Sequence, residues 1–485
     1  MKLIFSIALI AVGTAVGAHH EPPHSWVVLT ASITLSFSLM LYRHRKVILR
    51  FGKLTWTKEE IVRHVLITGD TGSGKTTSGL HPILHQLTKN MPDWGGLVLG
   101  AKGDEHEFIS ELLQTHGREN DLIHLQVRPS EESTKWKPPH RYNLLSNRSL
   151  PWSAHAKAIS DIAASMTEGQ QHAFFRPMAQ MAMANSFELL DELGEIVTLS
   201  KAHDVLTSKS NTEKRVKQLK RLPSNTRRLA LVDFFETNFT KARAHEQTEA
   251  VTATVKTYLG FFLDPDVAAV FSSEEPNTFS LAEVERGVVI TVTMPQRFVI
   301  ERRYIQTYLK ILFFYHALSR FDLSKEEFKN RNTLFFVADE FQTMVTATED
   351  GISDHNVIDR IRSAGVGIIA AMQSEISADP VVGERKRRVL TLNMRTRFVF
   401  RGADLEGANA SADHIGKREF WKSTKTSRPL KPVTYSRRKE QEHFIKAAQL
   451  MRLGDHTAVV VHPSKRYIKK KIIPLNGAGR PYKWF

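Results

Sequence analysis

The feature that most constrains this chain is a glycine-rich octapeptide directly after a short apolar run. Val65–Thr68 carries no charge and suits a buried strand, and Gly69–Thr76 follows at once with the spacing G-x-x-x-x-G-K-[ST]. Glycines at these positions let backbone N–H groups turn toward phosphate oxygens, and a helix is expected after them. The pattern therefore predicts a strand, a phosphate-binding loop and a helix in an α/β nucleotide-binding fold. We call Gly69–Thr76 the phosphate loop.

The phosphate loop also supplies particular chemical groups. Lys75 carries an amine that can neutralise the β- and γ-phosphates of ATP, and the Thr76 hydroxyl can ligate Mg²⁺. A glycine-rich turn without a ligand is the alternative interpretation. Residues expected to bind the nucleotide are Gly69, Asp70, Thr71, Gly72, Ser73, Gly74, Lys75, Thr76 and Thr77.

A second apolar run ends in two acids. Leu334–Ala338 is followed by Asp339 and Glu340. Asp339 is expected to hold Mg²⁺ through water. Glu340 is the expected general base for an attacking water. An ordinary strand end with two solvated carboxylates is the alternative.

A third strand candidate, Val366–Met372, ends at Gln373. An amide at a strand tip can contact a γ-phosphate and respond to its loss, so we include Gln373 among the catalytic candidates. Arg360 and Arg362 lie between the acidic strand and this one. Either arginine could reach the nucleotide of a neighbouring subunit or lie on a solvated helix surface.

The N-terminal segment predicts a membrane anchor. Residues 3–18 and 26–42 are uncharged apolar runs joined by a polar turn, and each is slightly shorter than the roughly 20 residues of a typical span. Basic residues flank the pair, whereas the turn has no Lys or Arg, which places both ends in the cytoplasm. We therefore expect a multi-pass membrane anchor with the rest of the chain in the cytoplasm. A signal peptide ending near Ala18 is the alternative.

Composition excludes several kinds of site. The chain has no cysteine, which rules out disulfides, cysteine-ligated zinc and a thiol nucleophile. The net charge of +16 is uneven, because residues 417–485 hold 18 basic and 4 acidic residues. A polyanionic partner is therefore plausible.

Two further regions have distinct patterns. From about residue 153 to 264, apolar positions recur every three or four residues and predict helices, among them 214–222 and 227–244. Within them, Lys209–Arg228 is basic and could contact DNA phosphates or an acidic partner, or simply be a solvated helix face. Lys417–Lys439 is basic with interleaved Trp421 and Tyr435, and its low apolar content predicts a long exposed loop. This loop could bind nucleic-acid phosphates, contact the inner leaflet or aid solubility.

Together these segments resemble the type IV coupling proteins of conjugation and type IV secretion, which are related to FtsK-type DNA pumps. The resemblance spans nearly the whole chain. Gly100 and Ala101 stand where the family usually has an Asp before Lys-Gly, and Leu144 replaces a proline. The matching segments, besides the N-terminal hairpin and the acidic strand, are His64–Gly69, Lys102–Asp104, Tyr142–Leu145, Val288–Pro295, Arg362–Ser374, Ala458–His462 and Tyr467–Pro474.

The resemblance implies a RecA-like motor with an inserted all-α domain and a transmembrane hairpin. The expected divisions are 1–46 for the anchor, 47–152 and 265–485 for the nucleotide-binding domain, and 153–264 for the all-α domain. It further implies that Arg362 assists hydrolysis in the adjacent subunit of a homo-hexamer and that Gln373 senses phosphate.

The implied activity is ATP hydrolysis with Mg²⁺ that drives transfer of DNA through a type IV secretion channel. The DNA is expected to be single-stranded and linked to a relaxase, and the relaxosome and the channel are the expected protein partners. A double-stranded DNA pump of the FtsK kind, export of protein effectors, and a docking receptor without productive hydrolysis are the alternatives.

Overall fold

A nine-stranded sheet forms the centre of the protein in this computed structural model. The structure describes residues 46–484, apart from 104, 134, 167–174, 243–244, 349–350 and 427–433. Neighbouring strands from β9 to β5 run parallel, and β12 and β13 add an antiparallel edge. Across the sheet the order is β13 (Tyr467–Lys471), β12 (Thr457–Val461), β9 (Thr396–Val399), β3 (Val65–Thr68), β8 (Val366–Met372), β7 (Leu334–Ala338), β4 (Gly95–Leu99), β6 (Val289–Thr293) and β5 (Leu122–Gln126). The predicted α/β class is confirmed.

The central strands are apolar along their whole length because both faces of the sheet are covered. In β7, Phe336 and Ala338 join one hydrophobic cluster, and Phe335 and Val337 join the other. The second cluster contains α4 (His81–Asn90), α5 (Glu105–Thr115) and the hairpin of β1 (Leu49–Phe51) and β2 (Leu54–Trp56). The first contains α13 (Val299–Leu318), α15 (Asp354–Ser363) and α16 (Asp379–Asn393).

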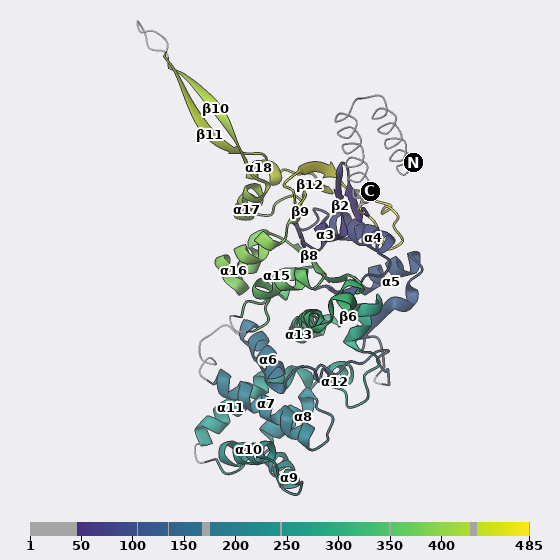
Figure 1. Ribbon diagram of the computed structural model, residues 1–485, viewed down its shortest axis with the longest axis vertical. Coiled ribbons are helices and arrows are strands. Elements are labelled where there is room, and N and C mark those ends of the chain that lie inside the picture. The colour runs from purple at the N-terminus through teal and green to yellow at the C-terminus, as the bar shows by residue number, and fades with distance from the viewer. Residues whose placement is uncertain are drawn as a thin grey trace, which may run out of the picture.

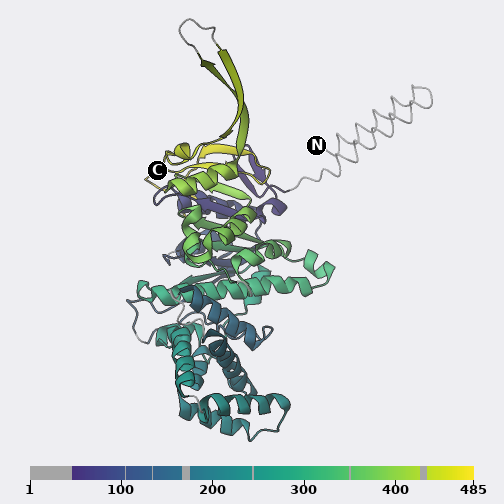
Figure 2. The same ribbon diagram turned by 90° about the vertical axis from the view of Figure 1, so that its left-hand side faces the viewer.

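The region between β5 and β6 is largely helical. It forms one end of the molecule in Figures 1 and 2, and its apolar residues continue the cluster that covers the sheet. Its helices are α6 (Trp152–Met166), α7 (Arg176–Glu192), α8 (Leu199–Thr207), α9 (Lys209–Leu219), α10 (Thr226–Phe235), α11 (His245–Leu259) and α12 (Pro265–Phe271).

The boundaries of two of these helices differ from the sequence-based expectation. The predicted helix 214–222 begins earlier, at Lys209, because the Ser208 hydroxyl accepts a hydrogen bond from the Asn211 N–H and caps it. The predicted helix 227–244 becomes α10 followed by a π-helical turn, Glu236–Thr240. Asn225 caps α10 in the same way, through the Arg228 N–H.

The basic region before β12 is not the exposed loop that its composition predicts. It forms two ten-residue antiparallel strands, β10 (Lys417–Thr426) and β11 (Thr434–His443), which project from the end opposite the helical region (Figures 1 and 2). A two-stranded ribbon that leaves both faces in solvent needs little apolar sequence, which explains the incorrect prediction. Cross-strand hydrogen bonds and ion pairs replace a core here.

The predicted membrane segments 3–18 and 26–42 lie outside the described residues. Among residues 46–484, where described, no helix combines the length and apolar character needed to cross a membrane.

Candidate active site

The phosphate loop connects the carboxyl end of β3 to the helix that begins at Lys75. Gly74 has a φ of 102°, and a Cβ there would lie 2.7 Å from Nδ1 of His456. Glycine is therefore required both by the backbone conformation and by the close approach of His456. His456 also donates its backbone N–H to the Ser73 carbonyl at 2.9 Å. This contact ties the phosphate loop to the segment that leads into β12.

The side chain of Lys75 turns back toward the phosphate loop. Its side chain is buried, and Nζ donates a hydrogen bond to the Asp70 carbonyl at 3.1 Å. Burial lowers the pKa of Lys75, while the nearby Glu340, Asp339 and Asp70 act in the opposite direction. The first N–H groups of a helix lack intrahelical partners, so the amine and the helix start together offer donors to an anion.

Thr76 and Asp339 meet although they are 263 residues apart in the chain. The Thr76 hydroxyl donates to Oδ2 of Asp339 at 2.8 Å. Asp339 is only 4% exposed, and this burial raises the pKa of its carboxyl group despite the hydrogen bond from Thr76. Hydroxyl and carboxylate oxygens are ligands that suit Mg²⁺, and a cation would favour the ionised carboxylate. The two predicted metal ligands thus fit a Mg²⁺ ion.

Glu340 has a left-handed backbone conformation, with φ 53° and ψ 46°. Such a conformation costs about 1–2 kcal/mol in a non-glycine residue and often marks a functional position. Its Oε2 atom accepts hydrogen bonds from the amides of Gln342, at 2.5 Å, and Gln373, at 3.4 Å. Because β8 lies between β3 and β7, Gln373 at its tip reaches both the phosphate loop and the acidic strand. Gln373 also accepts the Gly69 N–H at its carbonyl.

Several contacts at this site were not predicted from the sequence. Gln342 follows Glu340 by two residues, and that proximity is its only signal in the sequence. The backbone carbonyl of Arg401, just after β9, accepts a hydrogen bond from the Asp70 N–H at 2.7 Å. The Arg401 guanidinium lies 3.6 Å from the Asp70 carboxylate and 2.6 Å from the Asp455 carboxylate. Nothing local in the sequence around Arg401 indicates this role.

A cleft opens beside Thr76, Thr77 and Asp339. One wall comes from α5 and another from the C-terminal segment, including Asn476 and Tyr482. That segment is attached by the Leu475 N–H, which donates to the Thr77 carbonyl at 2.9 Å. Lys102, which follows β4, lines the same cleft. The cleft gives room for the rest of a nucleotide next to the phosphate loop.

Arg362 lies far from the phosphate loop of its own chain. It is exposed at the end of α15, close enough to His64 at the start of β3 to help lower the pKa of that histidine, which burial chiefly brings to about 4. The phosphate loop lies at the opposite end of β3. The seven residues of β8 separate the two ends of the sheet by about 20 Å. Arg362 and Arg360 are therefore not brought together with the other candidates.

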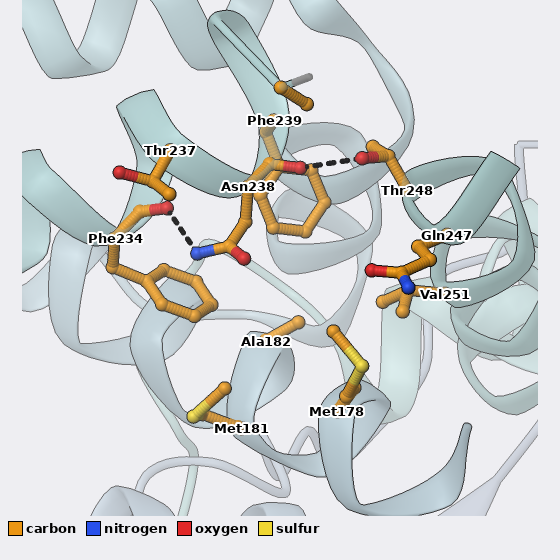
Figure 3. A pocket seen from close by; sticks show the side chains of 11 residues that line it. Met178, Met181, Ala182, Phe234, Thr237, Asn238, Phe239, Gln247, Thr248 and Val251 are labelled. Atoms are coloured by element: carbon orange, nitrogen blue, oxygen red, sulfur yellow. Dashed lines mark hydrogen bonds between the residues drawn. The ribbon is translucent and has the colours of Figure 1, made fainter. Parts of the chain in front are cut away.

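A separate hollow in the helical region does not belong to this site (Figure 3). The Thr248 hydroxyl donates to the Asn238 carbonyl, and the Asn238 amide donates to the Phe234 carbonyl, both at 2.8 Å. The part of the lining that the structure describes has no charged side chain and consists of Met178, Met181, Ala182, Phe234, Thr237, Asn238, Phe239, Ala242, Gln247, Thr248 and Val251. It is thus unsuited to a triphosphate.

Comparison with known families agrees with this geometry. The family model of the type IV secretion-system coupling protein DNA-binding domain matches residues 48–470. The chain belongs to this family. The resemblance stated from the sequence is therefore confirmed.

Solved structures of another coupling protein share the fold. The bacterial conjugative coupling protein TrwBdeltaN70 in an unbound form is 15% identical, with a TM-score of 0.65 over 91% of this chain and 92% of that one. TrwB in complex with ADP and Mg²⁺ is also 15% identical, with a TM-score of 0.63 over 91% and 92%. A search of curated proteins gives no match.

Proposed function

We propose that this coupling protein is an ATP hydrolase that drives transfer of DNA through a type IV secretion channel. The observation that carries the proposal is the 2.8 Å hydrogen bond between Thr76 and Asp339, beside a buried Lys75 and a restrained Glu340. These are the groups that phosphate binding, metal binding and water activation require, and one edge of the sheet brings them together.

Each residue would have a defined task. Lys75 and the loop N–H groups hold the phosphates, and Thr76 and Asp339 hold Mg²⁺, which neutralises charge on the phosphate oxygens. Glu340 takes a proton from the attacking water. The amides of Gln342 and Gln373 orient the Glu340 carboxylate. Gln373 would also register the loss of the γ-phosphate, since it contacts both Glu340 and Gly69.

Structures of TrwB in complex with ADP and Mg²⁺, and with a non-hydrolysable ATP analogue, support nucleotide and Mg²⁺ as cofactors. The family description as a DNA-binding domain supports DNA as cargo. We favour single-stranded, relaxase-linked DNA, with relaxosome proteins and secretion channel components as partners. The anchor at 1–46 would hold the chain in the bacterial inner membrane with the motor domain in the cytoplasm.

The position of Arg362 supports action between subunits. An arginine about 20 Å from its own phosphate loop can assist hydrolysis only in a neighbour, so we propose a closed homo-hexameric ring. ATPase rate per subunit should then rise steeply with protein concentration, and single-stranded DNA should shift that rise to lower concentration. A full rate per subunit at concentrations where the protein is monomeric contradicts the ring.

The Glu340→Gln variant tests the site directly. It should lose at least 100-fold in ATP turnover because Gln cannot accept a proton, yet it should still bind Mg²⁺-ATP. Lys75→Ala should lose both binding and turnover. Turnover is measured by phosphate release and binding by a fluorescent ATP analogue, with Glu326→Gln on the exposed helix α14 (Lys325–Lys329) as the matched control. Wild-type turnover in Glu340→Gln contradicts the assignment.

A further inference from the structure

The projecting hairpin β10–β11 has two faces with different chemistry. In an antiparallel pair, residues opposite each other point to the same side, and that side alternates along the strand. Trp421 lies opposite Lys439, and Ser423 lies opposite Arg437, so these four residues share one face. We call it the Trp421 face. Lys422 and its partner Arg438 lie on the other face.

Ion pairs neutralise much of the other face. Arg418 lies 3.4 Å from Glu442, and Lys422 lies 3.1 Å from Glu440. The first pair lies directly across the strands and the second diagonally, and together they leave one cation, Arg438, in the described part of that face.

The outer half of the Trp421 face keeps its positive charge available. Arg437 is exposed and has no ion pair with any residue that the structure describes. Lys439 lies over the indole ring, 5.3 Å from its centroid, with Glu419 at the limit of an ion pair, 3.9 Å away. Trp421 itself is 64% exposed, which leaves most of its side chain open to solvent beside these cations.

An exposed indole beside two cations suits a single-stranded nucleic acid. Bases stack on aromatic rings, and arginine and lysine neutralise the adjacent phosphates. Arg437 and Lys439 are two residues apart, about 7 Å along the strand, so the charges follow a line along the ribbon. A linear polyanion can lie along that line. A duplex offers no unstacked base to Trp421.

We propose that the Trp421 face of the hairpin binds single-stranded DNA, with a base stacked on Trp421 and phosphates held by Arg437 and Lys439. This assignment rests on the proposed function, in which DNA is the cargo. A lipid surface is a second polyanion, but it would meet the cations of both faces or the tip of the hairpin. The difference between the two faces therefore favours a strand of nucleic acid.

Two neighbouring arginines supply a matched test. Arg437→Ser and Arg438→Ser remove the same charge from adjacent exposed positions that point to opposite faces. Binding of the full-length chain, in zwitterionic detergent, to fluorescent thirty-nucleotide oligo-dT is measured by anisotropy at several salt concentrations. Arg437→Ser should weaken binding severalfold and reduce the slope of log K against log salt by about 0.7. Arg438→Ser should leave both unchanged.

Trp421 is tested separately because stacking does not depend on salt. Trp421→Ala should weaken oligo-dT binding about tenfold with an unchanged salt slope, and Trp421→Phe should recover most of the affinity. Thermal unfolding of each variant verifies that the hairpin change leaves the rest of the protein folded. Equal losses in Trp421→Ala and Trp421→Phe would point to a packing role and overturn the stacking assignment.

The outcomes separate this inference from the proposed function. If the wild type binds oligo-dT but Arg437→Ser and Arg438→Ser bind it equally well, the Trp421 face is not the site and the inference fails alone. If Arg437→Ser loses only binding to anionic vesicles, the face contacts lipid and the inference also fails. If the wild type binds no DNA while hydrolysing ATP, the cargo in the proposed function is wrong as well.

Discussion

Lys310 is a lysine with no exposed side-chain surface. Its ammonium donates to Oδ2 of Asp354 and to the Met344 carbonyl, both at 2.5 Å, and Asp354 also accepts the N–H of Thr346. Burial lowers the pKa of Lys310, whereas the Asp354 carboxylate opposes that shift. This pair joins α13 to the segment that follows Glu340 and to the first turn of α15, so single residues here connect the site to the helix that carries Arg362.

Removal of one member of this pair should be severe. Lys310→Met leaves the Asp354 carboxylate buried without its cation and should lower the free energy of unfolding by about 3–5 kcal/mol. Lys310→Met combined with Asp354→Asn should recover part of that loss, because Asn keeps an acceptor for Thr346 without a charge. Urea-induced unfolding measures both, with Lys325→Met at an exposed position as the control. An additive double variant would show that the two residues do not interact.

Arg362 provides a second prediction at the residue scale. If it acts on a neighbour's nucleotide, inactive Arg362→Ala subunits mixed with inactive Glu340→Gln subunits should regain activity, since some mixed interfaces hold both intact groups. When equal amounts mix at random in closed rings, about a quarter of the interfaces pair an intact Glu340 with an intact Arg362. We therefore expect up to about a quarter of wild-type ATPase activity. Arg360→Ala, two residues away and also exposed, should remain active by itself. Mixtures without any recovery would place Arg362 outside the site.

At the scale of elements, Glu285, in the short helix before β6, joins several segments of the fold. Its carboxylate accepts from Nε2 of His316 at 2.9 Å, near the end of α13, and from Arg320 at 2.7 and 2.9 Å. Arg320 in turn donates to the Ala364 carbonyl just before β8. Burial alone would raise the pKa of Glu285, but the hydrogen bonds and charges of His316 and Arg320 outweigh it and lower the pKa to about 2.

The lowered pKa of Glu285 determines how the stability of the protein changes with pH. A folded-state pKa of about 2, below the ordinary 4.5, means that the ionised carboxylate stabilises the folded chain above pH 4.5. That contribution is lost as pH falls from 4.5 toward 2. Glu285→Gln should therefore lower the melting temperature clearly at pH 7 and much less near pH 3. Calorimetry at both values measures the difference, with the exposed Glu326→Gln as control; equal losses at both pH values would contradict it.

At the scale of the whole molecule, the described chain has a hairpin at one end, the sheet in the middle and the helical region at the other end (Figure 2). Residues 48–56, which follow the predicted anchor, pack on the side of the sheet near β13, since Ile468 contacts the turn at Gly52. If residues 1–46 lie in the membrane, the helical region points away from it into the cytoplasm.

The absence of cysteine makes that orientation easy to measure. A single cysteine in the polar turn, His20→Cys, should react with a membrane-impermeant maleimide in intact spheroplasts, because the predicted turn lies outside. Lys53→Cys, exposed in the turn between β1 and β2, should react only after lysis. Intact mass distinguishes a retained hairpin from a signal peptide cleaved near Ala18. Labelling of Lys53→Cys in intact spheroplasts would contradict a cytoplasmic motor.

The sequence by itself determined the strands and motifs whose chemistry is local. The spacing of Gly69–Thr76 and the acids after Ala338 require no distant partner, and the strands predicted at 65–68, 334–338 and 366–372 have those bounds in the structure. Tertiary structure alone decided what surrounds them. Strand pairs such as Val65 with Ile369 join positions some 300 residues apart. The pairing of β3 with β9, and of β9 with β12, brings Arg401 and His456 to the phosphate loop.

The hairpin and Arg362 show the same division. Composition showed that 417–439 is basic and poor in apolar residues, but cross-strand register decides that Trp421, Arg437 and Lys439 share a face. Likewise the sequence placed Arg362 near Gln373, only eleven residues away, whereas the extended strand β8 separates them by about 20 Å. The residues that carry the chemistry can be found from local spacing, because covalent geometry holds neighbours in the chain close together. Where those residues lie in the molecule depends on the order of the strands, and the packing of the entire core determines that order.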